Sequence, residues 1–420
     1  MAIVAPEGLH LGGRRASAEV GASGVLARLL ADAVRVEPDR VAFRDGPGRH
    51  AWTGRPCYEL NCAIASEAVR RLAAYLGELA LGAGARVGIC LPNGSEAAMA
   101  LLAVGEAGLV PCLLDATASA GELSGAIEAG DVRAVITQAR LGTDKLAEKL
   151  CFVAAGFYRL RFLLAFGPNV PDGVVDLDPI LLEPRASRTF PAWPDDGTLP
   201  GIVTFARCPS NRRPAARSYR SLIAAAVPIV AAARLKPGER LLTFFPPDDL
   251  KGLATGIVAG LVAGATVEAH LAFESRALAD AVSNEQPTHV VLPGWMEASL
   301  EALEPGPGLR SIVLVHEPPL RLKAREGASA RIVDVVCCGE LGLLSSVRRR
   351  GDEISFTDLC TAGKSGPDTA LVEACLSDRN EICLRGAAVG EGGVSVQTLE
   401  EWLPSGLVLD ARASEIVALR

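Results

Sequence analysis

Apolar residues follow two periods along the first half of this chain. Spacings of three and four residues predict helices, and short β-branched runs predict strands. The predicted helices cover 24–35, 58–79, 96–107 with Ser95 as its cap, and 120–129; the predicted strands cover 41–43, 86–91, 110–114 and 134–137. Strands separated by helices at this spacing predict crossover connections and a parallel sheet.

The same alternation resumes in the second half of the chain. The predicted strands cover 201–205, 241–245, 265–269, 289–292, 311–315 and 331–338, and the predicted helices cover 221–234, 253–262, 276–285 and 295–303. Beyond Gly351 the pattern changes to short apolar runs separated by turn residues. This change predicts a smaller and more antiparallel β region.

A chain of 420 residues is too long for one ordinary core, so we expect several subdomains. The predicted fold class is α/β, with two parallel-sheet α/β subdomains and a small C-terminal β region. The expected divisions are a flexible leader over 1–23, an N-terminal α/β subdomain over 24–190, a second α/β subdomain over 191–350 and a small β-rich region over 351–420.

A basic segment connects the predicted strand 201–205 to Ser218, which is placed to cap the helix that follows. Anions often bind where such a loop meets a helix N-terminus. The segment lacks Gly and Lys and has a single hydroxyl, Ser210, but it carries four arginines: Arg207, Arg212, Arg213 and Arg217. Guanidinium groups can hold an anion through paired hydrogen bonds. A solvated basic loop is the alternative.

Composition excludes several classes of protein. A net charge of −7 gives no support for nucleic-acid binding. Eleven scattered cysteines and five histidines without metal-ligand spacing favour reduced thiols in a cytoplasmic protein over disulfides or zinc. The apolar run over 252–267 is short and rich in glycine, which favours close helix packing in a core over a membrane span. The first 23 residues lack the pattern of a signal peptide.

Six segments in order resemble the large domain of the adenylate-forming enzymes, the superfamily of acyl- and aryl-CoA synthetases and fatty acyl-AMP ligases. In the first half these are EPDRVAF and RVGICLPNGSEAAMALLAVGEAGLVPCLL. In the second half they are FFPPDDLKGLATGIVAGLVAGATV, VCCGELGLL, EICLRGAAV and EEWLPSGLVLD. VCCGELGLL is similar to the YGxTExG motif, which puts Glu340 on the motif glutamate.

The resemblance implies chemistry in which a carboxylate attacks ATP to give an acyl-adenylate and a thiol of coenzyme A or pantetheine then takes the acyl group. It implies Glu340 as a catalytic residue and Mg²⁺ ligand. It also implies nucleotide or anion contacts from Arg207, Ser210, Arg212, Arg213 and Asp410, and a substrate pocket formed by Asp248, Asp249, Gly252, Cys338 and Gly339. The implied ligand is a carboxylic acid or acyl group.

The chain departs from the family pattern at the positions that handle phosphate. Arg207 to Arg212 stand in place of the TSGTTG loop, and Ala215-Ala216 replace its Lys-Gly. The ribose aspartate falls on Leu407, with Asp410 three residues away. The resemblance also implies a mobile C-terminal domain beyond Arg420. We therefore expect a degenerate phosphate loop and a missing C-terminal domain.

Three residue groups keep two interpretations each. Glu340 could contact a metal or nucleotide, or could accept hydrogen bonds from neighbouring loops. Asp248 and Asp249 could form a carboxylate pair, or cap the helix before Leu250. Cys337 and Cys338 could supply a nucleophile, or be buried inert thiols.

The sequence thus predicts a diverged acyl-CoA synthetase-like ligase domain with weak or no activity of its own. The alternatives are a non-catalytic binder of an acyl or adenylate ligand and a pseudo-enzyme partner of an active ligase. The expected partners are a separate C-terminal domain chain, an acyl carrier protein or a second copy of the chain.

Overall fold

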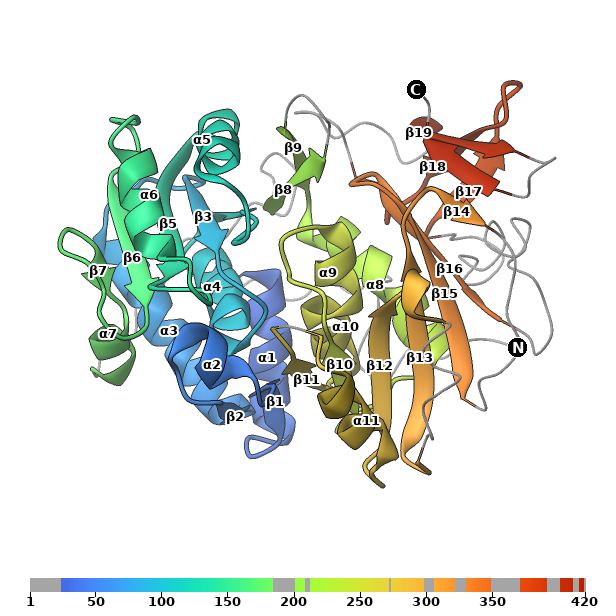
Figure 1. Cartoon of the computed structure of the whole chain (residues 1–420), viewed down its shortest axis with the longest axis horizontal. Coiled ribbons are helices and arrows are strands. Elements are labelled where there is room, and N and C mark those ends of the chain that lie inside the picture. The colour runs from blue at the N-terminus through green and yellow to red at the C-terminus, as the bar shows by residue number, and fades with distance from the viewer. Residues whose placement is uncertain are drawn as a thin grey trace, which may run out of the picture.

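The part of the chain that the structure describes forms three β-sheets, with helices packed around two of them (Figure 1). The computed structural model describes residues 24–183, 201–207, 212–271, 273–297, 306–321, 330–348, 371–390, 401–410 and 415–418. Within these residues the helices are α1 Val25–Val36, α2 Arg49–Thr53, α3 Cys62–Glu78, α4 Ser95–Glu106, α5 Ala120–Ala129, α6 Leu146–Ala154, α7 Asp178–Leu182, α8 Tyr219–Ala233, α9 Leu250–Thr255, α10 Ile257–Ala263 and α11 Ser275–Ser283, with a 3-10 turn at Gly294–Met296.

The first sheet has seven strands in the order β7-β6-β5-β3-β4-β8-β9. The strands are β3 Arg86–Cys90, β4 Val110–Leu113, β5 Val132–Gln138, β6 Phe162–Phe166, β7 Val175–Asp176, β8 Ile202–Arg207 and β9 Arg212–Arg217. All neighbours are parallel except β8 and β9. Side chains on one face pack with α5 and α6, and those on the other face pack with α3 and α4. A parallel sheet covered on both faces explains its nearly continuous apolar strands.

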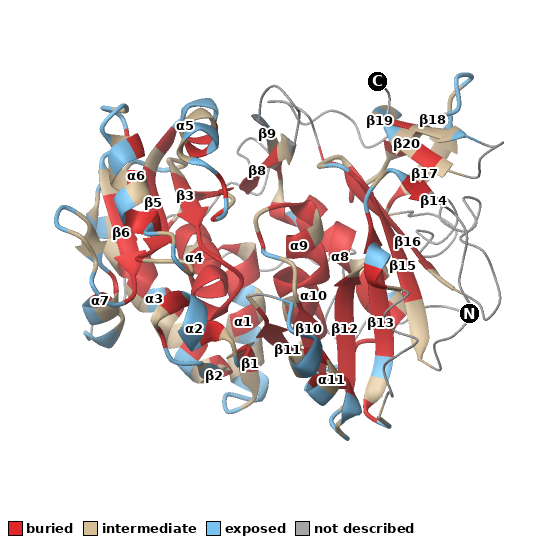
Figure 2. Cartoon of the chain, viewed as in Figure 1, coloured by how far each residue is buried: buried red, intermediate tan, exposed pale blue. Residues whose placement is uncertain are grey.

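The second sheet has eight strands in the order β16-β15-β13-β12-β10-β11-β1-β2. The strands are β1 Val41–Asp45, β2 Glu59–Asn61, β10 Arg240–Thr243, β11 Thr266–Ala269, β12 Thr288–Pro293, β13 Leu309–His316, β15 Arg331–Cys338 and β16 Gly342–Val347. The two edge strands β2 and β16 are antiparallel to their neighbours. One large apolar core joins this sheet to α8, α10, α4 and the first sheet, as the buried interior in Figure 2 shows.

A third sheet of five antiparallel strands has the order β14-β20-β19-β18-β17. The strands are β14 Leu320–Arg321, β17 Glu373–Leu376, β18 Glu381–Arg385, β19 Leu403–Asp410 and β20 Glu415–Ala418. This sheet confirms the predicted antiparallel region near the end of the chain. The predicted fold class is confirmed as well: two mostly parallel α/β sheets and a small antiparallel sheet.

Sheet membership crosses the expected division at residue 190. β1 and β2 come from the N-terminal part of the chain but extend the second sheet, and β8 and β9 follow the division but complete the first sheet. The two sheets are therefore interleaved along the chain. The expected leader over 1–23 lies outside the described residues.

Several predicted elements differ from the observed ones for identifiable reasons. The predicted helix over 58–79 begins only at Cys62, because β2 precedes it and Asn61 caps it through a bond from the Ile64 N–H at 2.8 Å. Ser95 is the first residue of α4, not its cap, and its hydroxyl donates to Asp45. α2, α6, β6, β7, α7 and β16 carry no predicted counterpart.

Glycines interrupt the apolar run over 252–267 and let it pack closely. The run forms two helices, α9 and α10, which meet at Gly256. A Cβ at Gly252 would lie 1.9 Å from the Pro246 carbonyl oxygen, and one at Gly260 would lie 2.1 Å from a Val267 methyl carbon. The interpretation as a closely packed core segment is confirmed at these positions. Among the described helices, none is both long and apolar enough to cross a membrane.

Candidate functional site

Glu340 lies in the turn directly after β15, at the carboxyl end of a parallel strand. Its Oε2 accepts a hydrogen bond from Thr204 Oγ1 of β8 at 2.5 Å. The Leu250 N–H at the start of α9 lies 3.3 Å from Oε1 and 3.2 Å from Oε2. One carboxylate thus holds together three segments that are far apart in the sequence. In α/β proteins, ligands bind at this edge of a sheet.

The surroundings of Glu340 disfavour its ionised form. Burial raises the pKa of the Glu340 carboxyl, and the negative charge of Asp249 raises it further. The hydrogen bond from Thr204, the charge of Arg217 and the Leu250 N–H lower the pKa in part. A raised pKa in a partly buried carboxyl is a common property of functional sites, although buried structural groups share it.

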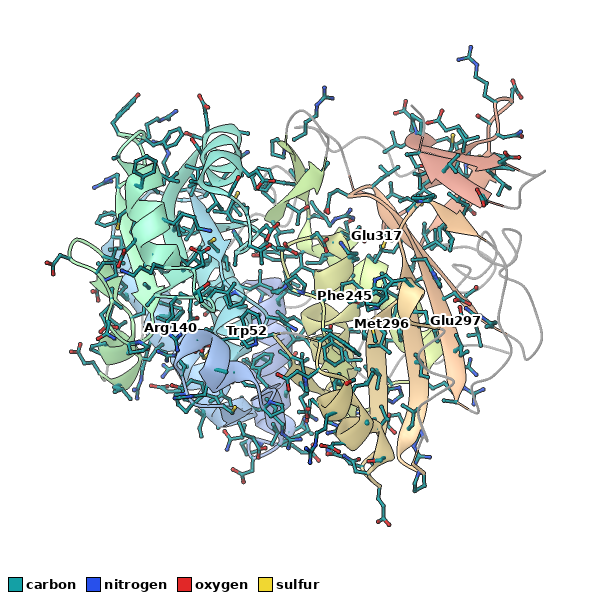
Figure 3. The ribbon with its side chains drawn as sticks, viewed as in Figure 1. Trp52, Arg140, Phe245, Met296, Glu297 and Glu317 are labelled. Carbon is teal, nitrogen blue, oxygen red and sulfur yellow. The ribbon has the colours of Figure 1, made fainter. Side chains whose placement is uncertain are left out.

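Asp249 caps α9 and also pairs with a lysine. Its Oδ1 accepts from the Gly252 N–H at 2.9 Å, so the capping interpretation fits Asp249. Its other oxygen bonds Lys251, whose Nζ lies 3.1 Å from Glu317 Oε1. Phe245 and Glu317, both labelled in Figure 3, flank this lysine, which is 6.0 Å from the Phe245 ring centroid. Burial lowers the pKa of Lys251, but the carboxylates of Asp249 and Glu317 outweigh this effect and hold it well above its ordinary value.

The expected basic loop from Arg207 to Arg217 is largely a β-hairpin, which corrects the prediction. β8 and β9 pair antiparallel from Ile202 and Arg217 to Arg207 and Arg212. Only the four residues 208–211 between the strands are left to connect them; they include Ser210 and lie outside the described residues. β9 is an edge strand of the first sheet, and Pro214 within it is compatible with such a position.

The arginines of this hairpin have different surroundings. Arg213 is exposed, whereas Arg217 is buried with a relative exposure of 5%. Arg217 Nη1 donates to Ser221 Oγ and to the Ala388 carbonyl, both at 2.9 Å, and Nη2 donates to the Glu340 carbonyl at 2.6 Å. Burial lowers the pKa of Arg217 to about 10. Arg217 is therefore a structural residue, and the predicted four-arginine cluster does not form as one exposed group.

Three further predicted residues lie at the end of β15, and a fourth lies in the third sheet. Gly339 has a φ of 58° in the turn before Glu340, a left-handed conformation that suits glycine. Cys337 and Cys338 end β15 and are buried, and burial raises the Cys337 pKa well above its ordinary value, as expected of an inert thiol. Asp410 ends β19 in the third sheet, where it is exposed and opposite Glu415.

A second buried polar cluster fixes the two large sheets against each other. Arg49 contacts Asp45 at 3.1 Å and also bonds Glu96, while Arg55 reaches Glu96 at 2.7 Å and Asp178 at 2.5 Å. Asp45 belongs to the second sheet and Glu96 to a helix of the first. These ion pairs link β1 of the second sheet to α4, which packs on the first sheet.

Sequence reasoning missed Thr204, Lys251 and the structural role of Arg217. Thr204 sits inside an apolar strand, where a single hydroxyl carries little signal. Lys251 follows two aspartates and is the only lysine between residues 237 and 322, which is a usable signal for a paired cation in an apolar helix. Within the described residues, no three His, Cys, Asp or Glu side chains converge as a metal site would require.

Parts of the sequence match a known protein family and a curated protein. Residues 30–157 match the family model of AMP-binding enzymes. A salicyl-AMP ligase / salicyl-S-ArCP synthetase of Mycobacterium tuberculosis is 33% identical over 184 residues. The aligned stretch covers 42% of this chain and 29% of that protein, so the chain matches under a third of the relative's length.

Solved structures match nearly the whole fold. The N-terminal domain of FACL13 from Mycobacterium tuberculosis superposes with a TM-score of 0.68 at 15% identity, covering 94% of this chain and 99% of that one. The anthranilate CoA ligase AuaEII, solved with anthranoyl-AMP, superposes with a TM-score of 0.69 at 13% identity, covering 94% and 76%. The fold is that of the large domain of adenylate-forming enzymes, which confirms the resemblance drawn from the sequence.

Proposed function

We propose that this chain is a diverged large domain of the carboxylate-activating ligases, which binds an acyl- or aryl-adenylate and has weak or no ligase activity alone. The observation that carries the proposal is the convergence on the Glu340 carboxylate. Thr204 lies on the first strand of the hairpin that stands in place of the phosphate loop, Leu250 begins the helix that resembles the substrate-pocket helix, and Glu340 matches the motif glutamate. The similarity to a salicyl-AMP ligase and to a ligase solved with anthranoyl-AMP supports an aromatic acid as substrate class.

Weak catalysis is supported by the state of the charged groups. Phosphoryl chemistry needs positive charge where negative charge develops. In this chain the guanidinium of Arg217 is occupied by carbonyl oxygens, and Lys251 is occupied by two carboxylates. Both oxygens of Glu340 already contact internal donors. These groups are poor candidates for holding a triphosphate.

Whether the described residues could hold a nucleotide or Mg²⁺ depends on which of their polar groups are available. An adenylate could use Arg213, which is exposed on β9. The residues described here do not form a preassembled Mg²⁺ site, because no three carboxylate, His or Cys side chains among them converge as a metal cluster. We therefore assign no step to Mg²⁺. Coenzyme A or pantetheine, a carrier protein and a separate C-terminal domain remain parts of the proposal that await direct test.

The test is calorimetry with an acyl-sulfamate analogue of salicyl-adenylate, which cannot react. We expect the wild-type chain to bind it, and Thr204→Val to weaken binding about tenfold by removing the donor that fixes Glu340. Thr266→Val is the matched control, since Thr266 is a buried strand threonine of the second sheet that donates to the carbonyl of Val41 in the same sheet. Absence of binding by the folded wild-type chain would contradict the proposal.

ATP–pyrophosphate exchange separates a binder from an enzyme. The proposal predicts exchange near background with salicylate, anthranilate and aliphatic acids, even where the analogue binds. The internal bonds of Arg217 and Glu340 favour this non-catalytic alternative. Robust exchange with any of these acids would show instead that the chain is an active ligase.

A further inference from the structure

Three arginines lie at the amino ends of neighbouring strands in the first sheet. Arg86 is the first residue of β3, Arg133 the second of β5, and Arg161 directly precedes β6. The register pairs Arg86 with Val132 and Ala134 with Phe162, and the Arg161 N–H donates to the Arg133 carbonyl at 2.8 Å. Three arginines from distant parts of the sequence thus lie side by side at the amino ends of parallel strands, whereas Glu340 lies at a carboxyl end.

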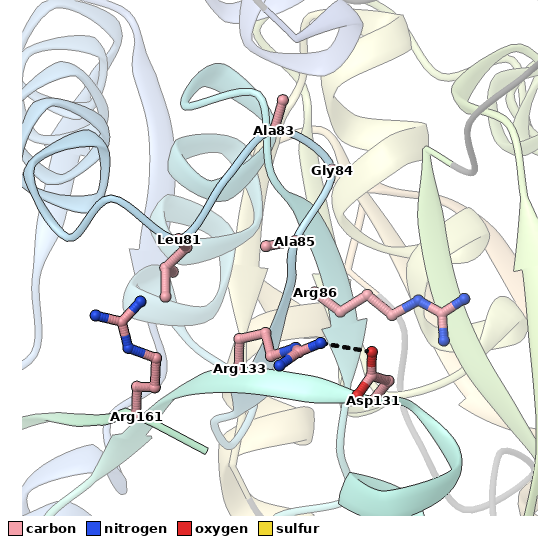
Figure 4. A pocket seen from close by; sticks show the side chains of 8 residues that line it. All are labelled: Leu81, Ala83, Gly84, Ala85, Arg86, Asp131, Arg133 and Arg161. Carbon is pink, nitrogen blue, oxygen red and sulfur yellow. Dashed lines mark hydrogen bonds and ion pairs between the residues drawn. The ribbon is translucent and has the colours of Figure 1, made fainter. Parts of the chain in front are cut away.

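These arginines line a pocket of about 530 Å³ with Leu81, Ala83, Gly84, Ala85 and Asp131 (Figure 4). This volume is in the range of small-molecule sites, roughly 300–1,000 Å³. Three cations and one carboxylate among the eight lining residues leave a formal charge of +2 on a chain whose net charge is −7. A local excess of positive charge on an acidic protein attracts anions to that place.

The charges in the pocket are only partly neutralised. Arg86 donates to the Gly130 carbonyl at 2.9 Å, which uses a donor without cancelling the charge. Arg133 meets Asp131 at 3.1 Å, but Asp131 also meets Arg159 at 3.0 Å, so one carboxylate is shared by two arginines. Arg161 is exposed and lies over the Phe162 ring at 5.2 Å. Each guanidinium keeps N–H groups for a further acceptor.

We propose that this pocket binds a small anion that carries two or more phosphate groups. Guanidinium groups recognise phosphate oxygens through paired, charge-assisted hydrogen bonds, and three of them on adjacent strands suit a ligand with several such oxygens. The small residues Ala83 and Gly84 form the other wall, where a ligand can approach the backbone. The inference is independent of the proposed adenylate site.

Calorimetry with inorganic tripolyphosphate in low-salt buffer tests the site. We expect one equivalent to bind, with an affinity that falls as salt is added. The double variant Arg133→Gln, Arg161→Gln should weaken binding about tenfold or more. Arg35→Gln together with Arg276→Gln is the charge-matched control, because these two arginine side chains are 75% and 94% exposed and lie on α1 and α11. Equal binding by wild type and the double variant would overturn the proposal, as would no binding by wild type.

Two further variants sharpen the result. Asp131→Asn removes the carboxylate that competes with the ligand, so it should strengthen tripolyphosphate binding; Asn also tolerates the positive φ of 46° at this position. Weaker binding in Asp131→Asn would count against the site. Glu340→Gln should leave the affinity unchanged, which separates this pocket from the proposed adenylate site. If the double variant unfolds, Arg161→Gln alone remains usable, because Arg161 is exposed.

Discussion

Arg217 Nη2 donates to the main-chain carbonyl of Glu340 at 2.6 Å, so a buried cation from β9 holds the turn that presents the candidate carboxylate. The same side chain binds the Ala388 carbonyl beyond the third sheet's β18, at 2.9 Å. A guanidinium can do this because it offers five N–H donors in a fixed plane. The bond couples the hairpin, the end of β15 and the last part of the chain in one arrangement.

Replacing Arg217 should cost much of the stability of this arrangement. In Arg217→Met the volume is nearly kept, but buried carbonyl oxygens lose their donor. We expect a loss of about 2–4 kcal/mol in the free energy of unfolding, measured by urea denaturation. Arg276→Met, at a side chain that is 94% exposed, should change it by less than about 0.5 kcal/mol. Equal effects of the two variants would show that the Arg217 bonds contribute little.

The raised pKa of Glu340 predicts how stability depends on pH. In the unfolded chain this carboxyl ionises near its ordinary pKa, whereas the folded protein keeps its proton to higher pH. Between the pKa of the unfolded chain and the higher pKa of the folded protein, the folded state binds more protons than the unfolded state. This group therefore makes stability fall as pH rises. Glu340→Gln removes the titration. We expect the unfolding free energy of wild type minus that of the variant to fall as the pH rises above the ordinary pKa of a glutamate carboxyl. A difference that stays constant or rises with pH would contradict this.

Most of the fold could be predicted from the sequence because its helices and strands are strongly patterned. The helix Ala120–Ala129 and the strand Arg331–Cys338 have the predicted bounds. Errors arose where tertiary contacts override local signals. Ser95 is a residue type typical of a helix cap, yet its hydroxyl donates a hydrogen bond to Asp45 in β1 of the second sheet. The pairing of β8 with β9 depends on an edge position that no local pattern reveals.

The candidate site was predicted only in outline. Glu340 was found through a motif, and the structure places it at a strand end beside β8 and α9. The partners of Glu340 could not be found, because Thr204 and Leu250 come from segments 136 and 90 residues away. In the sequence, the residues around Arg217 predict an exposed basic loop. Its burial follows from the packing of three segments, which residue type alone does not encode.

The ion cluster around Glu96 should be essential for the contact between the two large sheets. Glu96 is 2% exposed and binds both Arg49 and Arg55. Glu96→Gln leaves two buried guanidinium groups without this carboxylate, so we expect a loss of about 3–5 kcal/mol in unfolding free energy. Glu67→Gln is the matched control, because Glu67 pairs with Arg70 and Arg71 at the surface and should cost at most about 1 kcal/mol. A small loss in Glu96→Gln would mean that other contacts hold the sheets together.

The cysteines should differ sharply in reactivity, which tests whether a thiol near Glu340 can act as a nucleophile. Cys57 is exposed, whereas Cys337 is buried with a raised pKa, and burial raises the pKa of Cys90 and Cys112 to about 12. The thiolate is the reactive form, so iodoacetamide should modify Cys57 in the folded protein and reach Cys337 only after unfolding. Peptide mapping by mass spectrometry assigns each site and separates Cys208 and Cys360, which lie outside the described residues. In Cys57→Ser the modification at position 57 should vanish while Cys337 stays protected. Modification of Cys337 as fast as that of Cys57 in the native protein would instead reveal an accessible, activated thiol beside the candidate site.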